Sequence, residues 1–131
     1  MNTLIRPFLR NESGASASEF ALVLPLVLIV IFGAITAGAL GYTIVNLQQA
    51  TETSARCLSA KRSDCSLDNI TTFAQNRYSG PSLNGLAFTA EWNADCNGYR
   101  VTGSGTFGFF MGSGLLSVPL STQACYPGFN S

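Results

Sequence analysis

The feature of this 131-residue chain that most constrains its fold is an apolar run near the N-terminus. From Phe20 to Leu40 the sequence carries no charged residue, and Glu19 stands at the edge of the run. As an α-helix rising about 1.5 Å per residue, this segment spans roughly 31 Å, enough to cross the hydrocarbon core of a bilayer. The run therefore predicts one membrane-spanning helix and leaves roughly ninety residues for a single small domain.

Composition excludes several functional classes. The net charge is zero with no long basic run, so we expect no nucleic-acid partner. The chain has no histidine, which removes histidine-based nucleophilic, acid–base and metal-binding chemistry. Asp64, Asp68, Glu91 and Asp95 form no recognisable catalytic pair. We therefore expect no enzymatic activity, no metal site and no cofactor.

The four cysteines all lie on the C-terminal side of the apolar run, at Cys57, Cys65, Cys96 and Cys125. An even number in a small exported domain favours disulfides, with three possible connectivities. Proximity along the chain favours Cys57–Cys65 and Cys96–Cys125. No pair has C-x-x-C spacing, so zinc binding is the weaker interpretation. Disulfides in turn imply an oxidising compartment.

The apolar run has three interpretations. It can be a secretory signal peptide, with an apolar region over residues 21–32 and cleavage after Ala39 that releases a soluble binding domain. It can be a plain membrane anchor, with or without an enzymatic domain behind it. The third interpretation is a prepilin-type signal, in which Gly14 closes a polar leader, Ala15 follows, and Glu19 and Phe20 come just before the apolar helix.

The run SGASASEFALVLPLVLIVIFG resembles the N-terminus of TadE-like minor pilins or pseudopilins of the tight-adherence (Tad/Flp) type IV pilus systems. The string EFALVLP at residues 19–25 is its most specific part. The resemblance implies that a prepilin peptidase cuts after Gly14, making Ala15 the new N-terminus, and that Glu19 and Phe20 act in assembly. It also implies a set of partners: other pilin or pseudopilin subunits, the prepilin peptidase, the pilus assembly platform and the membrane.

Physical chemistry gives Glu19 a reason to act in assembly. A carboxylate at the hydrocarbon edge costs free energy unless it meets a cation or hydrogen-bond donors. An amine exposed at Ala15 by cleavage can pair with the Glu19 of a neighbouring subunit. The alternative is that Glu19 is solvated by headgroups beside a helix N-terminus, whose dipole suits a negative charge.

Small residues recur every fourth position further along the apolar run, which allows another helix to approach closely. They form two rows: Gly33, Ala37 and Gly41, and beside them Ala34 and Gly38. The alternative is that small residues are simply common in membrane helices. The basic leader residues Arg6 and Arg10 favour a cytoplasmic N-terminus, although basic residues also follow the run. We therefore expect a single-pass protein of the bacterial inner membrane with a periplasmic C-terminal domain, which can also enter an extracellular pilus.

The predicted fold is α+β, with three regions: a cytoplasmic leader at 1–14, a transmembrane and stalk helix at 15–60, and an exported disulfide-stapled domain at 61–131. On the outer part of the long helix, Ile44, Leu47, Ala50 and Ser54 form a mildly apolar face. It alternates with a polar face made of Tyr42, Val45, Gln49, Glu52 and Arg56. A short helix is expected over Ser66–Tyr78, with Ser66 as its N-cap. Its apolar face is expected to consist of Leu67, Ile70, Phe73, Ala74 and Tyr78.

Beyond residue 86 the apolar period changes to two, which predicts a three-stranded antiparallel sheet. The first strand runs from Leu86 to Trp92, and Asn97-Gly98 forms the hairpin turn before a second strand. Gly103 and Gly105 weaken that second strand or mark a bulge. A third strand follows at 115–125, with Pro119 confining it to an edge. The aromatic cluster at 107, 109 and 110 is expected to pack in the core rather than to form a ligand pocket.

Overall fold

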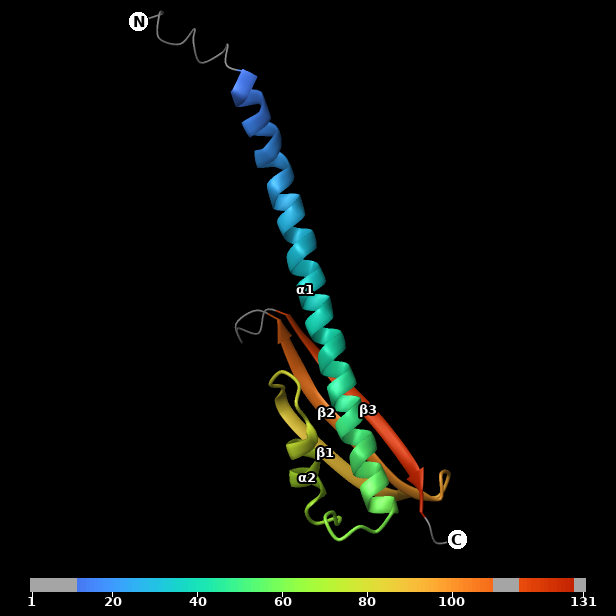
Figure 1. Ribbon diagram of the computed structural model, residues 1–131. Helices are drawn as coiled ribbons and strands as arrows, with labels where there is room; N and C mark the ends of the chain where they lie inside the picture. The colour runs from blue at the N-terminus through green and yellow to red at the C-terminus, as the bar shows by residue number, and fades with distance from the viewer. Residues whose placement is uncertain (1–11, 110–115, 129–131) are drawn as a thin grey trace, which may run out of the picture. The chain divides into compact units, whose positions relative to one another are not determined.

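The computed structural model describes residues 12–109 and 116–128, and its elements follow the predicted α+β order (Figure 1). They are α1 (Glu12–Ser59), α2 (Ile70–Arg77), β1 (Asn84–Asn93), β2 (Gly98–Phe109) and β3 (Leu116–Pro127). The chain divides into two compact units, Met1–Ala37 and Gly38–Ser131. We call the second unit the head. Helix α1 contributes its N-terminal part to the first unit and its C-terminal part to the head.

In the first unit, the described residues form only the N-terminal part of α1. Every residue from Gly14 to Ile35 is exposed. Pro25 lies within α1 and does not end it, although proline removes one backbone donor. The long apolar helix predicted from the sequence is confirmed.

The head contains a single antiparallel sheet with the strand order β1-β2-β3, so β1 and β3 are its edges. Pro119 pairs with Thr106 on the edge strand β3, as predicted. The β1–β2 connection is the turn at residues 94–97, where Asn97 adopts a left-handed φ of 50°. A Cβ atom on Gly98 would lie 1.7 Å from the carbonyl oxygen of Tyr126, so glycine is required there by the close approach of β3.

The C-terminal part of α1 packs on one face of this sheet (Figure 1). Its buried face is made mostly of small and hydroxyl-bearing residues together with two leucines, Leu47 and Leu58, of which Leu47 is fully buried. Thr51 Oγ1 donates to the Leu47 carbonyl oxygen at 2.7 Å and lies 2.8 Å from Thr122 Oγ1 of β3. Leu47, Ala50 and Ser54 are buried as expected, whereas the prediction for Ile44 is wrong, because its side chain is 40% exposed.

The two glycines of β2 have a packing role that the sequence did not predict. The register of β2 with β3 is continuous through Gly103 and Gly105, so neither glycine is an extra residue in β2. A Cβ on Gly103 would lie 2.8 Å from Thr51 Oγ1, and one on Gly105 would lie 2.9 Å from Leu83 Cβ. These glycines therefore let α1 and the segment before β1 approach the sheet closely. The β1–β2 register shifts between Asn84 and Ala87, opposite the part of β2 that contains Gly105, so the predicted bulge is present at Gly105 with its extra residue in β1.

Helix α2 covers the free edge of β1. Thr71 Oγ1 donates to the Phe88 carbonyl oxygen at 3.2 Å, and Gln75 Nε2 donates to that of Leu86 at 3.4 Å. These bonds use carbonyl groups of an edge strand that another chain could otherwise pair with. The predicted helix start at Ser66 is wrong: α2 begins at Ile70 after a turn in which the Ser66 N–H donates to Asn69 Oδ1.

That later start also changes the apolar face of the short helix. Leu67 precedes α2 and is 52% exposed, so its predicted place on that face is wrong. Ile70 and Ala74 are buried as expected, and Phe73 packs against the core.

Both favoured disulfides are present. Cys57–Cys65 joins the last turns of α1 to the following loop, and Cys96–Cys125 joins the hairpin turn to β3. Phe107 is buried and meets Phe109 edge to face, with ring centroids 5.1 Å apart, which supports packing over a ligand pocket. Phe110, the third member of the predicted cluster, lies outside the described residues.

Candidate functional site

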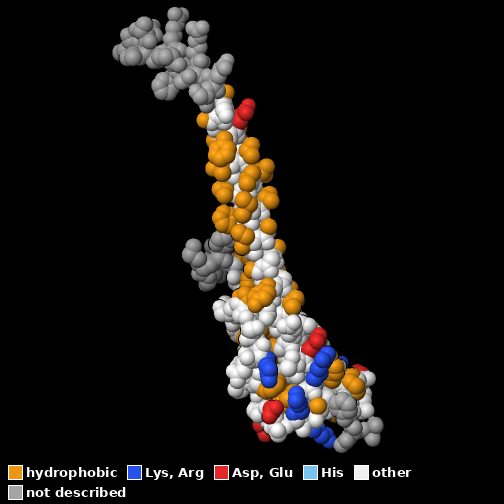
Figure 2. Space-filling model, viewed as in Figure 1, with side chains coloured by type: hydrophobic (Ala, Val, Ile, Leu, Met, Phe, Trp, Pro, Cys, Tyr) orange, Lys and Arg blue, Asp and Glu red, His pale blue; other side chains and the backbone are white. Residues whose placement is uncertain are grey.

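The surface of the first unit is the most apolar part of the chain. Within α1, an 18-residue window reaches a mean hydropathy of 2.8 with none of its residues buried. Figure 2 shows hydrophobic side chains covering the visible face of this segment. By length and composition, α1 is the one helix among the described residues that can cross a membrane. An apolar surface of this extent requires lipid or protein around it.

Two hydroxyl groups in this segment donate hydrogen bonds within their own helix. Ser18 Oγ donates to the Ala15 carbonyl oxygen at 2.8 Å, and Thr36 Oγ1 donates to that of Phe32 at 2.7 Å. These bonds lower the cost of placing hydroxyl groups in hydrocarbon. Glu19 differs, because its carboxylate is exposed and has no hydrogen-bond or ion-pair partner among the residues that the structure describes.

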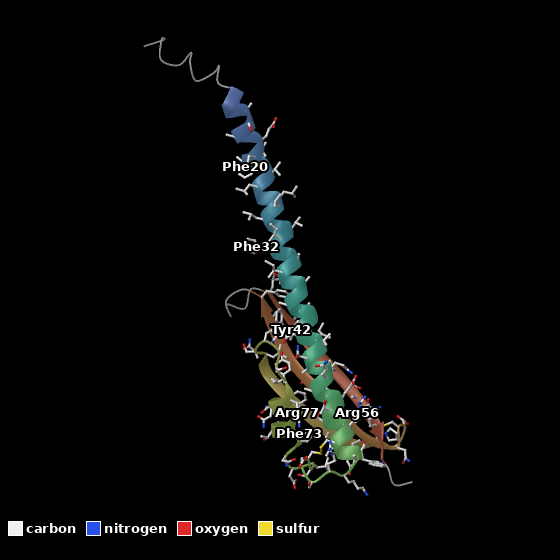
Figure 3. The ribbon with its side chains drawn as sticks, in the orientation of Figure 1. Phe20, Phe32, Tyr42, Arg56, Phe73 and Arg77 are labelled. Atoms are coloured by element: carbon white, nitrogen blue, oxygen red, sulfur yellow. A yellow bond between two sulfur atoms is a disulfide. The ribbon has the colours of Figure 1, made fainter. Side chains whose placement is uncertain are left out.

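The structure places all four predicted processing and assembly residues on this exposed helix. Gly14, Ala15 and Glu19 lie within its first turns, and the Phe20 ring is 66% exposed (Figure 3). Ala15 and Glu19 are four residues apart, a spacing that puts them one turn apart on the same helix face. The carboxylate and the bond predicted to be cut therefore share one local surface.

The predicted packing glycines have no packing partner among the residues that the structure describes. A Cβ atom added to Gly33, Gly38 or Gly41 would meet no heavy atom within 4 Å. Ala34 and Ala37 are likewise exposed. These positions contrast with Gly103, where an added Cβ would clash with packed side chains. Within the described part of the chain, nothing requires these positions to be small.

Exposed apolar residues also occur on the head portion of α1, where the sequence interpretation placed a polar face. Tyr42 and Val45 are 57% and 54% exposed. Burial raises the pKa of the nearby Tyr78 hydroxyl, and the interaction with Tyr42 adds to that rise. The sequence contains a signal for this exposed apolar surface, because Tyr42 and Val45 continue the apolar run. Their helical spacing from Gln49, however, favoured assigning them to the polar face.

Comparison with known proteins supports the predicted resemblance. Residues 14–56 match the sequence model of a family described as TadE-like protein. The matched segment begins at Gly14, includes Glu19 and the small residues, and ends at Arg56 within α1. Neither the curated proteins nor the solved structures gave a match. The resemblance to TadE-like proteins is confirmed over this segment.

Proposed function

We propose that this chain is a minor pilin or pseudopilin of a Tad/Flp type IV pilus, which acts by assembly rather than by catalysis. A prepilin peptidase would cut after Gly14, and the mature chain would begin at Ala15. The TadE-like match over residues 14–56 supports this assignment. The observation that carries it is Glu19, a carboxylate with no hydrogen-bond or ion-pair partner among the described residues, at the edge of a helix surface that is otherwise apolar.

The energetics of that carboxylate favour a partner from another subunit. Charged side chains at the centre of a membrane helix cost about 2.5–3.5 kcal/mol on insertion scales, and less toward its ends. The helix N-terminus returns roughly 0.3–1 kcal/mol of this through its dipole. A new amine at Ala15 would supply a positive charge, and pairing it with the Glu19 of a neighbour would neutralise both groups. Assembly and charge neutralisation would then occur together.

The exposed small residues fit the same model. If a neighbouring helix packs against Gly33, Ala34 or Ala37, the absence of large side chains allows close backbone approach and favourable van der Waals contact. Lipid alone would not distinguish these positions from the leucines and valines around them. The proposal places the protein in the inner membrane, with the head in the periplasm and with pilin subunits and the assembly platform as partners.

Substitution of Glu19 tests the assembly role. We expect Glu19→Ala to be inserted and to fold normally but to lose co-purification with the other pilin subunits from detergent-solubilised membranes of the native host. Glu52→Ala is the matched control, because it removes a carboxylate from the head, where Glu52 accepts a hydrogen bond from Gln48 Nε2 at 3.0 Å. Unchanged co-purification and piliation with Glu19→Ala would show that this carboxylate has no part in assembly.

A further inference from the structure

The head contains a cavity of about 710 Å³ that neither the TadE-like match nor the assembly proposal explains. Four separate segments of the head line it: the last turns of α1, the loop after it, α2 and the end of β3. Three arginines line it, Arg56, Arg62 and Arg77, together with the aromatic rings of Phe73 and Tyr126. We call this feature the arginine cavity. Figure 3 shows Arg56 on α1 close to Arg77 and Phe73 on α2.

Two of these guanidinium groups are oriented by aromatic rings. The Arg56 guanidinium carbon lies 4.7 Å from the centroid of the Tyr126 ring, and that of Arg77 lies 5.1 Å from the centroid of Phe73. A guanidinium group stacked on a ring uses its flat face, so the N–H groups along its edge stay available as donors. The two aromatic contacts therefore hold both arginines with their donors unused.

The third arginine is held by the covalent structure of the loop. The Cys57–Cys65 disulfide closes the turn after α1, and the Arg62 N–H donates to the Cys57 carbonyl oxygen at 3.3 Å. Asp64 is the one carboxylate lining the cavity among the described residues, against three arginines. None of the three guanidinium groups forms an ion pair within the described part of the chain. The cavity therefore has excess positive charge.

The positions of Arg56 and Arg77 at helix ends explain part of the positive charge of the cavity. They do not explain why three arginines surround one cavity. Arg56 and Arg77 each lie in the last turn of a helix, where a cation complements the dipole. That effect acts on each helix separately and gives no reason for Arg62 to join them around one hollow. All three arginine side chains are exposed, so water screens their mutual repulsion. An anion bound between them would gain charge-assisted hydrogen bonds, because guanidinium groups donate paired hydrogen bonds to carboxylate and phosphate.

We propose that the arginine cavity binds a small organic anion, one that carries a carboxylate or a phosphate on a body the size of a sugar. The volume lies within the range of about 300–1,000 Å³ typical of small-molecule sites. The charged group would bind the guanidinium edges, and the body would contact Phe73 and the apolar wall beside it. This inference concerns the head alone and holds whether or not the chain is a pilin.

The test uses the full chain in non-ionic detergent, with NMR signals of the arginine side-chain Nε–Hε groups as the readout. The probes are glucuronate, glucose 6-phosphate, inorganic phosphate and neutral glucose. We expect the two sugar anions to shift the signals of Arg56 and Arg77 saturably, and glucose to leave them unchanged. A response to glucuronate alone or to glucose 6-phosphate alone identifies the anion as carboxylate or phosphate. A response to inorganic phosphate equal to that of glucose 6-phosphate would show an adventitious ion only, and would overturn the proposal.

Variants separate binding from folding. Arg56→Gln and Arg77→Gln are each expected to weaken sugar-anion binding by about tenfold or more, because each removes a charge-assisted hydrogen-bond donor. Arg100→Gln is the matched control, because Arg100 pairs with Glu91 in the β1–β2 register and does not line the cavity. Equal affinity in all three variants, or no shift with any anionic probe, would refute the proposal. Thermal unfolding of each variant confirms that the head remains folded.

Discussion

Gly103→Ala tests the close approach of α1 to the sheet. The added Cβ would lie 2.7 Å from Phe88 Cε1 and 2.8 Å from Thr51 Oγ1, whereas ordinary van der Waals contact begins at 3.4 Å. Neither neighbour can move freely, because Phe88 is 3% exposed and Thr51 is held by hydrogen bonds to Leu47 and Thr122. Overpacking of this kind costs about 1–3 kcal/mol. We expect Gly103→Ala to destabilise the head by that amount.

Gly108→Ala is the control, because it makes the same change in the same strand where an added Cβ meets nothing within 4 Å. At such a site alanine restricts the unfolded chain, so we expect Gly108→Ala to be neutral or to stabilise the head by up to about 1 kcal/mol. The two substitutions therefore have opposite predicted signs, although their chemistry is identical.

Trp92 provides the assay, since it is the single tryptophan of the chain and lies in β1 of the head. Its fluorescence during thermal or guanidinium unfolding of the full chain in detergent reports on the head. For a unit of this size, a loss of 1 kcal/mol lowers the midpoint by about 4–8 °C. Equal stability of the Gly103→Ala and Gly108→Ala variants would refute the argument that Gly103 is required by helix–sheet packing.

Two further perturbations have predictable signs. The Cys96–Cys125 and Cys57–Cys65 disulfides close loops with sequence separations of 29 and 8. Because the entropy that a disulfide removes from the unfolded chain grows with the length of the loop, replacing both cysteines of Cys96–Cys125 by serine should destabilise the head by about 3.6 kcal/mol. The same replacement of Cys57–Cys65 should cost about 2.5 kcal/mol. Denaturant titration of the two double variants measures this order, and a larger loss for Cys57–Cys65 would contradict it. The pKa of Tyr78 is raised above 10.0 by burial and then by Tyr42, so folding favours its protonated form. Stability should therefore be full below pH 10 and fall as pH rises beyond it. Tyr78→Phe should flatten that fall in alkaline unfolding curves, and an unchanged slope would contradict the assignment.

Local sequence patterns predicted the elements of this fold well. The apolar run predicted α1, and the change of period beyond residue 86 predicted the strands, because each depends on neighbouring residues. The two disulfides followed from proximity along the chain, and Pro119 was placed on an edge because it lacks a backbone donor. The motif around Glu19 was also local, and it led to the TadE-like resemblance that residues 14–56 confirm.

Features that depend on distant residues could not be predicted in this way. In the sequence, Gly103 carries the signal of a weakened strand, and only the position of Thr51 beside it reveals a packing requirement. Ser66 has the chemistry of an N-cap, but Asn69 accepts its N–H and delays the start of α2. The arginine cavity gave no sequence signal at all, because its residues come from four separate segments.

The central claim, that the apolar helix is a processed assembly segment, is tested most directly by the N-terminal sequence of the mature protein. The protein should be purified from membranes or pili of the native host and sequenced from its N-terminus. The account predicts a chain that begins at Ala15, the residue after Gly14. A chain that begins at Leu40 would identify a secreted domain released by signal peptidase, and an intact Met1 would show a plain anchor; either result would contradict the account.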